Sequence, residues 1–146
     1  MLDFSRSVDA QPLLIVDDDE PFRNRLARAL EKRGFAVTTA ASVSEGCNVA
    51  RRDKPTYAVL DLRLEDGSGL EIVKELQGSQ PEARIIVLTG YGNIATTVAA
   101  VKAGAIDYLP KPADADAVAA ALLERENALP PPPENPMSAD RVKWAV

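Results

Sequence analysis

Hydrophobic residues along most of the chain alternate between two patterns. Short aliphatic runs, typical of strands buried on both faces, are each followed by a segment whose apolar residues recur every three or four positions, as in an amphipathic helix. This alternation occurs five times. The predicted strands are 13–17, 35–40, 57–61, 84–89 and 106–109, and the predicted helices are 21–33, 42–53, 69–77, 93–103 and 113–129.

Residues at the ends of these segments support the helix assignments. Pro21 suits a first helical turn because it has no amide hydrogen to leave unpaired, and Ser42 can cap the next helix through its hydroxyl. Gly34 and Gly104 follow helical segments, where glycine commonly ends a helix in a left-handed conformation.

Five strand–helix units with doubly apolar strands predict an α/β domain, in which helices cover both faces of a parallel sheet. Right-handed crossovers restrict the topology, and we predict a doubly wound, flavodoxin-like five-stranded sheet of order 2-1-3-4-5. In such sheets, ligands bind at the carboxyl ends of the strands. Residues at that edge are therefore the candidates for chemistry.

The chain changes character on either side of this domain. Residues 1–11 are polar and mixed, so we expect a flexible N-terminus before a domain that spans 12–129. Residues 130–136 contain four consecutive prolines followed by Glu-Asn-Pro, which predicts a stiff polyproline-type linker. Residues 137–146, which include the only tryptophan, are expected to begin a further unit.

Composition excludes several functions. The 146 residues carry a net charge of −5, which argues against direct binding of nucleic acid. The two basic clusters lie in amphipathic helical patterns, where solvent-exposed faces are expected; they are Arg23, Arg25 and Arg28, and Arg51 and Arg52. The chain has no histidine, which excludes catalysis by histidine and metal sites with histidine ligands.

Cysteine content and hydropathy indicate the compartment. The single cysteine, Cys47, cannot form an internal disulfide, and we interpret it as a small, half-buried apolar residue and not a reactive thiol. No apolar run approaches the ~18 residues of a membrane span, and the first residues lack the apolar core of a signal peptide. We expect a soluble, cytoplasmic protein without a membrane partner.

Acidic, hydroxyl and amine side chains follow the predicted strands. They are Asp17 and Asp18 after the first strand, Asp61 at the end of the third, Thr89 with Gly90 at the fourth, and Lys111 after the fifth. Carboxylates ~4 Å apart repel each other by roughly 4 kcal/mol at an effective dielectric constant of about 20. A divalent cation between them relieves this repulsion, and hard oxygen ligands favour Mg²⁺.

The neighbouring residues at this edge suit phosphoryl chemistry. Lys111 adds a positive charge, Thr89 adds a hydroxyl donor, and Gly90 leaves the approach to Asp61 open. A carboxylate that attacks phosphorus needs a cation, a lysine and hydrogen-bond donors around the phosphoryl oxygens.

Four sequence blocks closely resemble response-regulator receiver domains, and the resemblance covers about residues 12–128. The blocks are Val16-Asp17-Asp18-Asp19, Val59-Leu60-Asp61-Leu62 with Gly67 and Gly69, Val87-Leu88-Thr89-Gly90, and Tyr108-Leu109-Pro110-Lys111-Pro112. The resemblance implies that Asp61 is the phosphoacceptor and that Asp17, Asp18, Asp61 and the backbone carbonyl of Arg63 hold Mg²⁺.

The same resemblance assigns the remaining site residues. Thr89 and Tyr108 match the switch pair of receivers, and Lys111 matches their phosphoryl-binding lysine, with Pro112 following a cis peptide bond. Arg63 and Tyr91 are expected to flank the route of the hydrolytic water beside Gly90. A receiver accepts the phosphoryl group from a sensor histidine kinase and later loses it, without being an enzyme in the usual sense.

A narrower resemblance concerns the RegA/PrrA/ActR redox-responsive transcription regulators of alphaproteobacteria. It is carried by residues 61–70, 88–96 and 130–142. Those regulators continue past the proline linker into a small helix-turn-helix domain, whereas this sequence stops at Val146. We therefore expect contact with DNA only through a C-terminal domain that is absent from this chain.

The resemblance also implies an output surface. Ile94, Val98 and Val101 fall on one side of the predicted helix 93–103. This helix, the fifth strand and the fifth helix are expected to form a homodimer face, although the same apolar residues could instead belong to the core.

The alternative function is a stand-alone receiver or phosphorelay carrier, which would need no DNA-binding output. Two other functions fit the residues less well. A phosphatase with an aspartyl-phosphate intermediate would want a second acid two residues after Asp61, where this chain has Arg63. A flavin-binding relative would need a phosphate loop of Ser, Thr or Gly after the first strand, where this chain is acidic.

Overall fold

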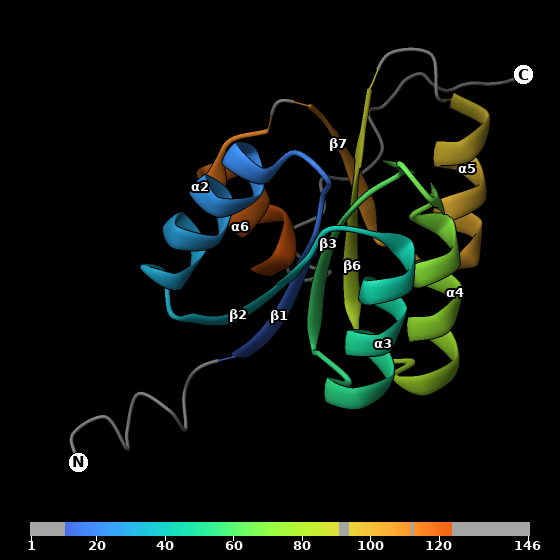
Figure 1. The fold of residues 1–146 in the computed structure, drawn as a ribbon, viewed down its shortest axis with the longest axis horizontal. Coiled ribbons are helices and arrows are strands. Elements are labelled where there is room, and N and C mark those ends of the chain that lie inside the picture. Colours follow the sequence, from blue (N-terminus) through green and yellow to red (C-terminus); the bar gives the residue numbers. More distant parts are fainter. Residues whose placement is uncertain (1–10, 91–93, 112, 124–146) are drawn as a thin grey trace, which may run out of the picture.

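The protein folds around one parallel sheet, shown in Figure 1. The computed structural model describes residues 11–90, 94–111 and 113–123, and the predictions for the N-terminus, the proline linker and the C-terminal residues lie outside these ranges. The strands of the main sheet are β1 (Gln11–Val16), β2 (Phe35–Ala40), β3 (Tyr57–Asp61), β6 (Arg84–Thr89) and β7 (Asp107–Pro110). The helices are α2 (Glu20–Glu31), α3 (Val43–Asp53), α4 (Leu70–Ser79), α5 (Ile94–Ala103) and α6 (Ala115–Leu123).

The strand order in this sheet is β2-β1-β3-β6-β7, with all neighbours parallel. Counted in chain order within the sheet, this is 2-1-3-4-5, so the predicted flavodoxin-like topology is confirmed. The prediction missed a short antiparallel hairpin directly after β3, formed by β4 (Arg63–Leu64) and β5 (Gly67–Ser68). Strands of two residues carry too little periodicity to be recognised in a sequence.

Two apolar cores lie on the two faces of the sheet. In β1, Leu14 and Val16 point into the core beneath α3 and α4, whereas Leu13 and Ile15 point into the core beneath α2 and α6. Figure 1 shows the same division, with α2 and α6 on one face and α3, α4 and α5 on the other. The middle positions of the central strands are apolar because alternate side chains enter different cores.

Capping residues define where the first two helices begin. Asp19 caps α2 by accepting a hydrogen bond from the Phe22 amide at 3.1 Å, and Pro21 lies in the first turn as predicted. The Ser42 hydroxyl accepts from the Glu45 amide at 3.1 Å, which confirms it as the cap of α3. The remaining boundaries agree with the predicted ones or differ from them by one or two residues. The predicted helix beyond residue 123 lies outside the described residues.

The apolar side of α5 faces outward. Ile94, Val98 and Val101 are 77%, 47% and 43% exposed, while the buried positions of this helix are Thr97 and Ala100. The structure thus rejects a core role for the predicted apolar stripe. None of the described helices is long and apolar enough to cross a membrane.

Gly69, which precedes α4, touches the backbone of β3. A Cβ atom at this position would lie 2.3 Å from the carbonyl oxygen of Asp61, far inside van der Waals contact. Backbone atoms cannot move aside as a flexible side chain can, so only glycine fits at this position.

We expect Gly69→Ala to lower the free energy of unfolding by about 1–3 kcal/mol, because the added methyl group displaces the end of β3. Urea denaturation monitored by circular dichroism measures this change. Gly78→Ala is the matched control, since a Cβ atom there meets nothing within 4 Å and glycine in a helix is unfavourable. A Gly69→Ala variant as stable as wild type would contradict the steric argument.

Candidate functional site

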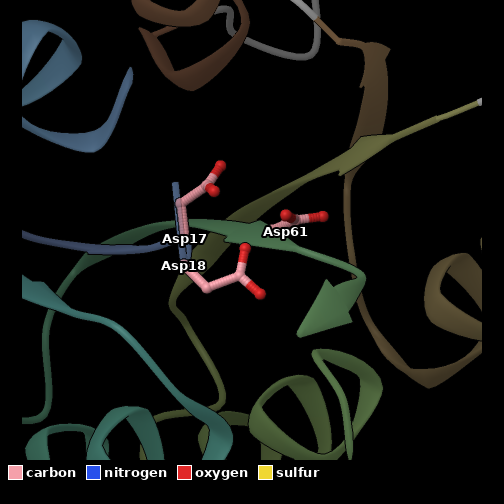
Figure 2. A group of neighbouring side chains, drawn as sticks. All are labelled: Asp17, Asp18 and Asp61. Atoms are coloured by element: carbon pink, nitrogen blue, oxygen red, sulfur yellow. The ribbon is translucent and has the colours of Figure 1, made fainter. Parts of the chain in front are cut away.

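Three carboxylates meet at the carboxyl ends of β1 and β3. Val16 pairs with Leu60 across these neighbouring strands, so Asp17 and Asp61 lie at the same edge. Asp17 is fully buried, Asp61 is 5% exposed, and Asp18 is half-buried. Figure 2 shows the three side chains around one point, and one oxygen of each lies within 4.8 Å of the others.

Lys111 joins this cluster from the end of β7. Its ammonium nitrogen lies 3.0 Å from Asp17 Oδ2 and 3.1 Å from Asp61 Oδ2, and 5.1 Å from the centre of the Phe22 ring. The backbone amide of Lys111 donates to the carbonyl of Thr89 at 2.8 Å, which fixes the end of β7 against the end of β6. The lysine predicted from the sequence is therefore in contact with two of the predicted acids.

Burial dominates the electrostatics of Asp17. It raises the pKa of this carboxyl group, and a hydrogen bond from the Asp19 amide and the contact with Lys111 offset only part of the rise. Burial would lower the pKa of Lys111, but its hydrogen bonds and ion pairs with Asp17 and Asp61 outweigh it and hold the pKa above its usual value. Lys111 is therefore a permanent positive charge between two acids.

Asp61 is oriented by its own strand end. Its Oδ1 accepts a hydrogen bond from the Arg63 amide at 3.0 Å, while Oδ2 faces Lys111. The Leu62 amide donates to the carbonyl of Leu88 at 3.2 Å, which ties the residue after Asp61 to β6. The carboxylate is thus held by contacts on both of its oxygens.

The acidic cluster fits a hard divalent cation. Three carboxyl groups meet one ammonium group here, so the acids outnumber the base. Asp17 Oδ2 is buried and has no hydrogen bond among the described residues, although it lies beside Lys111. One oxygen of each acid lies within 4.8 Å of the others, so the three could serve one cation together. The backbone carbonyl of Arg63 as a further ligand stays a prediction.

The remaining predicted residues lie around this cluster. Asp61 pairs with Leu88, so Thr89 is one residue further along β6 and is half-buried. Gly90 is exposed, and a Cβ atom there would meet nothing within 4 Å among the described residues. Tyr108 on β7 is 51% exposed and points outward, and the Arg63 side chain is exposed. Tyr91 and Pro112 lie outside the described residues.

Arg23 is a site residue that the sequence reasoning assigned wrongly. It was predicted to lie on a solvated face, but it is half-buried, and its Nη1 donates to the backbone carbonyl of Asp17 at 2.8 Å. The signal was present in the sequence, because Arg23 precedes the buried Leu26 and Ala27 by three and four positions. Arg25 and Arg28 are exposed as predicted.

Cys47 on α3 is half-buried, and burial raises the pKa of its thiol. A protonated thiol is a poor nucleophile, in agreement with the predicted apolar packing role.

The fold and the site together define a flavodoxin-like domain with an acidic site neutralised by lysine. The chain belongs to the response regulator receiver domain family, which it matches over residues 13–123. It is therefore the receiver domain of a two-component response regulator.

Two groups of relatives are similar over most of the chain. The photosynthetic apparatus regulatory protein RegA of Cereibacter sphaeroides is 65% identical over 132 residues, which cover 90% of this chain and 72% of that protein. The acid tolerance regulatory protein ActR of Rhizobium meliloti is 61% identical over 132 residues, with 90% of this chain and 68% of that protein covered. The similarity to the RegA and ActR group is thus confirmed.

Solved structures show the same fold. A response regulator from Burkholderia pseudomallei, crystallised with a phosphorylated aspartic acid, a calcium ion and citrate, has a TM-score of 0.74 and 46% identity. That comparison covers 81% of this chain and 68% of the other. The structure named FixJ-N has a TM-score of 0.67 and 36% identity, covering 76% of this chain and 89% of the other.

In metal-free protein, we expect Asp17→Asn to gain stability relative to wild type as the pH rises. Burial raises the pKa of Asp17 above its usual 3.8, so the folded state holds this proton more tightly than the unfolded chain. The stabilising contribution of Asp17 is therefore present at low pH and is lost as the pH rises through the raised pKa. Asparagine does not titrate.

Urea denaturation in the presence of a chelator, between pH values of about 4 and about 7, measures this effect. The unfolding free energy of the variant minus that of wild type should increase across the range. Asp53→Asn is the control, because the ion pair with Arg52 lowers the pKa of Asp53 and its difference should not increase. A constant difference for Asp17→Asn would contradict the assigned role of burial.

Proposed function

We propose that this receiver is phosphorylated on Asp61 by a partner histidine kinase, with Mg²⁺ held by Asp17, Asp18 and Asp61. The observation that carries the proposal is the contact of Lys111 with Asp17 and Asp61, beside a third carboxylate at the carboxyl edge of the sheet. A lysine and a cation site beside a strand-end aspartate provide what phosphoryl transfer to a carboxylate requires.

The transfer follows from the groups at the site. A carboxylate oxygen of Asp61 attacks the phosphorus of a phosphohistidine whose other ring nitrogen is protonated. The phosphorus–nitrogen bond breaks with its electron pair on nitrogen, so the kinase histidine leaves as a neutral imidazole. Lys111 stabilises the charge on the phosphoryl oxygens from a position that it already occupies, so no reorganisation is needed. Bound Mg²⁺ would neutralise the remaining phosphoryl charge. Asp61 accepts the phosphoryl group and later loses it, so the protein is itself the substrate and does not act as an enzyme in the usual sense.

The new phosphoryl group is proposed to shift a conformational equilibrium. Thr89 lies next to the site at the end of β6, and Tyr108 of the neighbouring β7 is paired with Val87 of β6. We infer that the Thr89 hydroxyl donates to a phosphoryl oxygen and that Tyr108, now 51% exposed, turns inward. A local charge change thereby favours one of two states of this surface.

Exposed apolar side chains on α5 and β7 support a homodimer. Ile94, Val98, Val101, Ile106 and Tyr108 are each more than 40% exposed on this side of the sheet. Exposed apolar residues that lie together indicate an interaction surface. We propose that phosphorylation favours dimerisation through α5, β7 and α6.

The output of the complete regulator is proposed to be transcriptional. The names of the similar proteins describe regulation of the photosynthetic apparatus and of acid tolerance. We place DNA recognition outside the receiver, in a C-terminal domain, because the net charge of −5 is unfavourable for binding DNA. Redox control is part of this proposal through the resemblance to the same regulators.

The central test is phosphorylation by a small phosphodonor. Wild-type protein incubated with acetyl phosphate and Mg²⁺ should gain one phosphoryl group by intact-mass spectrometry, and chelation of Mg²⁺ should abolish the gain. Asp61→Asn should gain none, because its amide is not a nucleophile. An unmodified wild type, or equal modification of the variant, would sink the proposal.

The dimer is tested on α5. Val98→Glu should leave folding unchanged, since this side chain is 47% exposed, but should weaken dimerisation of the phosphorylated protein by placing a charge in the interface. Sedimentation velocity at several protein concentrations measures the association. Lys74→Ala, at an exposed position of α4 and outside the proposed face, is the control and should dimerise as wild type does. Equal association of Val98→Glu would exclude this face.

A further inference from the structure

The hairpin directly after Asp61 is a small and isolated element. Its two strands of two residues each are joined by a turn at Glu65 and Asp66, with Arg63 opposite Ser68 and Leu64 opposite Gly67. An isolated two-stranded hairpin is at best marginally stable, so contacts outside it must hold it in place. Those contacts occur at its base and at its tip.

The base of the hairpin is attached to Asp61. The Arg63 amide donates to Asp61 Oδ1 at 3.0 Å, and the Gly69 amide donates to the carbonyl of Leu62 at 3.1 Å. Leu64 is buried in the core beneath α3 and α4. Any rotation of the hairpin about this base would change both the Arg63–Asp61 hydrogen bond and the direction of the Arg63 carbonyl.

The tip of the hairpin is attached to α3 by Asp66. Its Oδ1 accepts from the Val43 amide at 2.8 Å and its Oδ2 accepts from the Ser44 amide at 3.2 Å. These are the first two amides of the helix, which otherwise have no intrahelical partner. The helix supplies its own acceptor only for the third, since Ser42 accepts from Glu45. Asp66 therefore links the tip of the hairpin to a rigid helix by hydrogen bonds.

The chemistry of Asp66 makes this link strong. Hydrogen bonds from the amides of Val43 and then Ser44 hold the pKa of Asp66 below its usual value, so the carboxylate is ionised at neutral pH. Ionised acceptors form stronger hydrogen bonds than neutral ones, and the positive end of the α3 dipole adds attraction. Gly67 permits the turn with a φ of +151°, a conformation that side chains other than glycine rarely adopt.

We propose that Asp66 is a positioning residue for the phosphorylation site, which fixes the hairpin so that the Arg63 amide orients Asp61 and the Arg63 carbonyl reaches the bound cation. The second part of this proposal, the contact of the Arg63 carbonyl with the cation, rests on the proposed function. Its first part, the orientation of Asp61, concerns contacts that exist without metal. Loss of the Asp66 side chain would release the tip of the hairpin. Because its strands have only two residues each, motion of the tip would also displace Arg63.

Three control variants separate this role from simpler ones. Ser42→Ala removes a cap of the same helix without touching the hairpin, and it matches the loss of helix stability. Glu65→Gln removes a charge from the same turn, where Glu65 is exposed and makes no hydrogen bond or ion pair to the described part of the chain. Asp66→Asn keeps one oxygen acceptor and should give an intermediate result.

The experiment measures Mg²⁺ binding to the full chain by isothermal titration calorimetry. We expect Asp66→Ala to weaken binding by about tenfold, the lower end of the effect seen for residues that orient metal ligands. Ser42→Ala and Glu65→Gln should bind nearly as wild type does. Hydrogen exchange in metal-free protein provides a second readout, because the Arg63 amide should exchange faster in Asp66→Ala alone.

Each outcome decides between the proposals. If wild type binds no Mg²⁺ and gains no phosphoryl group, the proposed function fails, and the exchange of the Arg63 amide still tests the positioning role. If wild type binds and Asp66→Ala binds equally well with unchanged exchange at Arg63, the positioning role is wrong and the proposed function stands. Equal weakening by Ser42→Ala would reduce Asp66 to a helix cap, and equal weakening by Glu65→Gln would reduce it to a charge effect.

Discussion

The ammonium group of Lys111, held between the carboxylates of Asp17 and Asp61, is the interaction on which the rest of the site depends. Two almost fully buried acids at neighbouring strand ends would repel each other strongly without it. The contact also joins the ends of β1, β3 and β7, so three strands distant in sequence must align before the charges balance. A fold that brings these three strand ends together has already assembled the charged site that we propose to bind the phosphoryl group.

The backbone around Asp61 is also held in a fixed position beside these charges. Gly69 approaches the Asp61 carbonyl so closely that no side chain fits, and the following hairpin returns an amide to the Asp61 carboxylate. These restrictions lie on the polar edge of the sheet, while the two apolar cores beneath it supply the stability. The division lets the edge carry unfavourable charge without loss of the fold, because the central strands are buried on both faces.

In contrast to the central strands, α5 is poorly buried. Most of its apolar side chains face outward, and it contributes only a few small side chains to the core. A helix that buries few side chains can shift at low cost, which suits the response of α5 that we propose. The exposed apolar residues are unfavourable in an isolated domain, and burial against a partner would remove that cost.

Sequence alone determined the sheet topology and the main charged cluster. The strands are aliphatic runs with turns between them, and the carboxyl ends of parallel strands share one edge, so Asp17, Asp61 and Lys111 could be brought together without a structure. Tertiary structure decided the outward side of α5, the contact of Arg23 with the Asp17 carbonyl, and the link from Asp66 to α3. These depend on the distance between backbone and side-chain atoms of separate elements, which periodicity along one element does not encode.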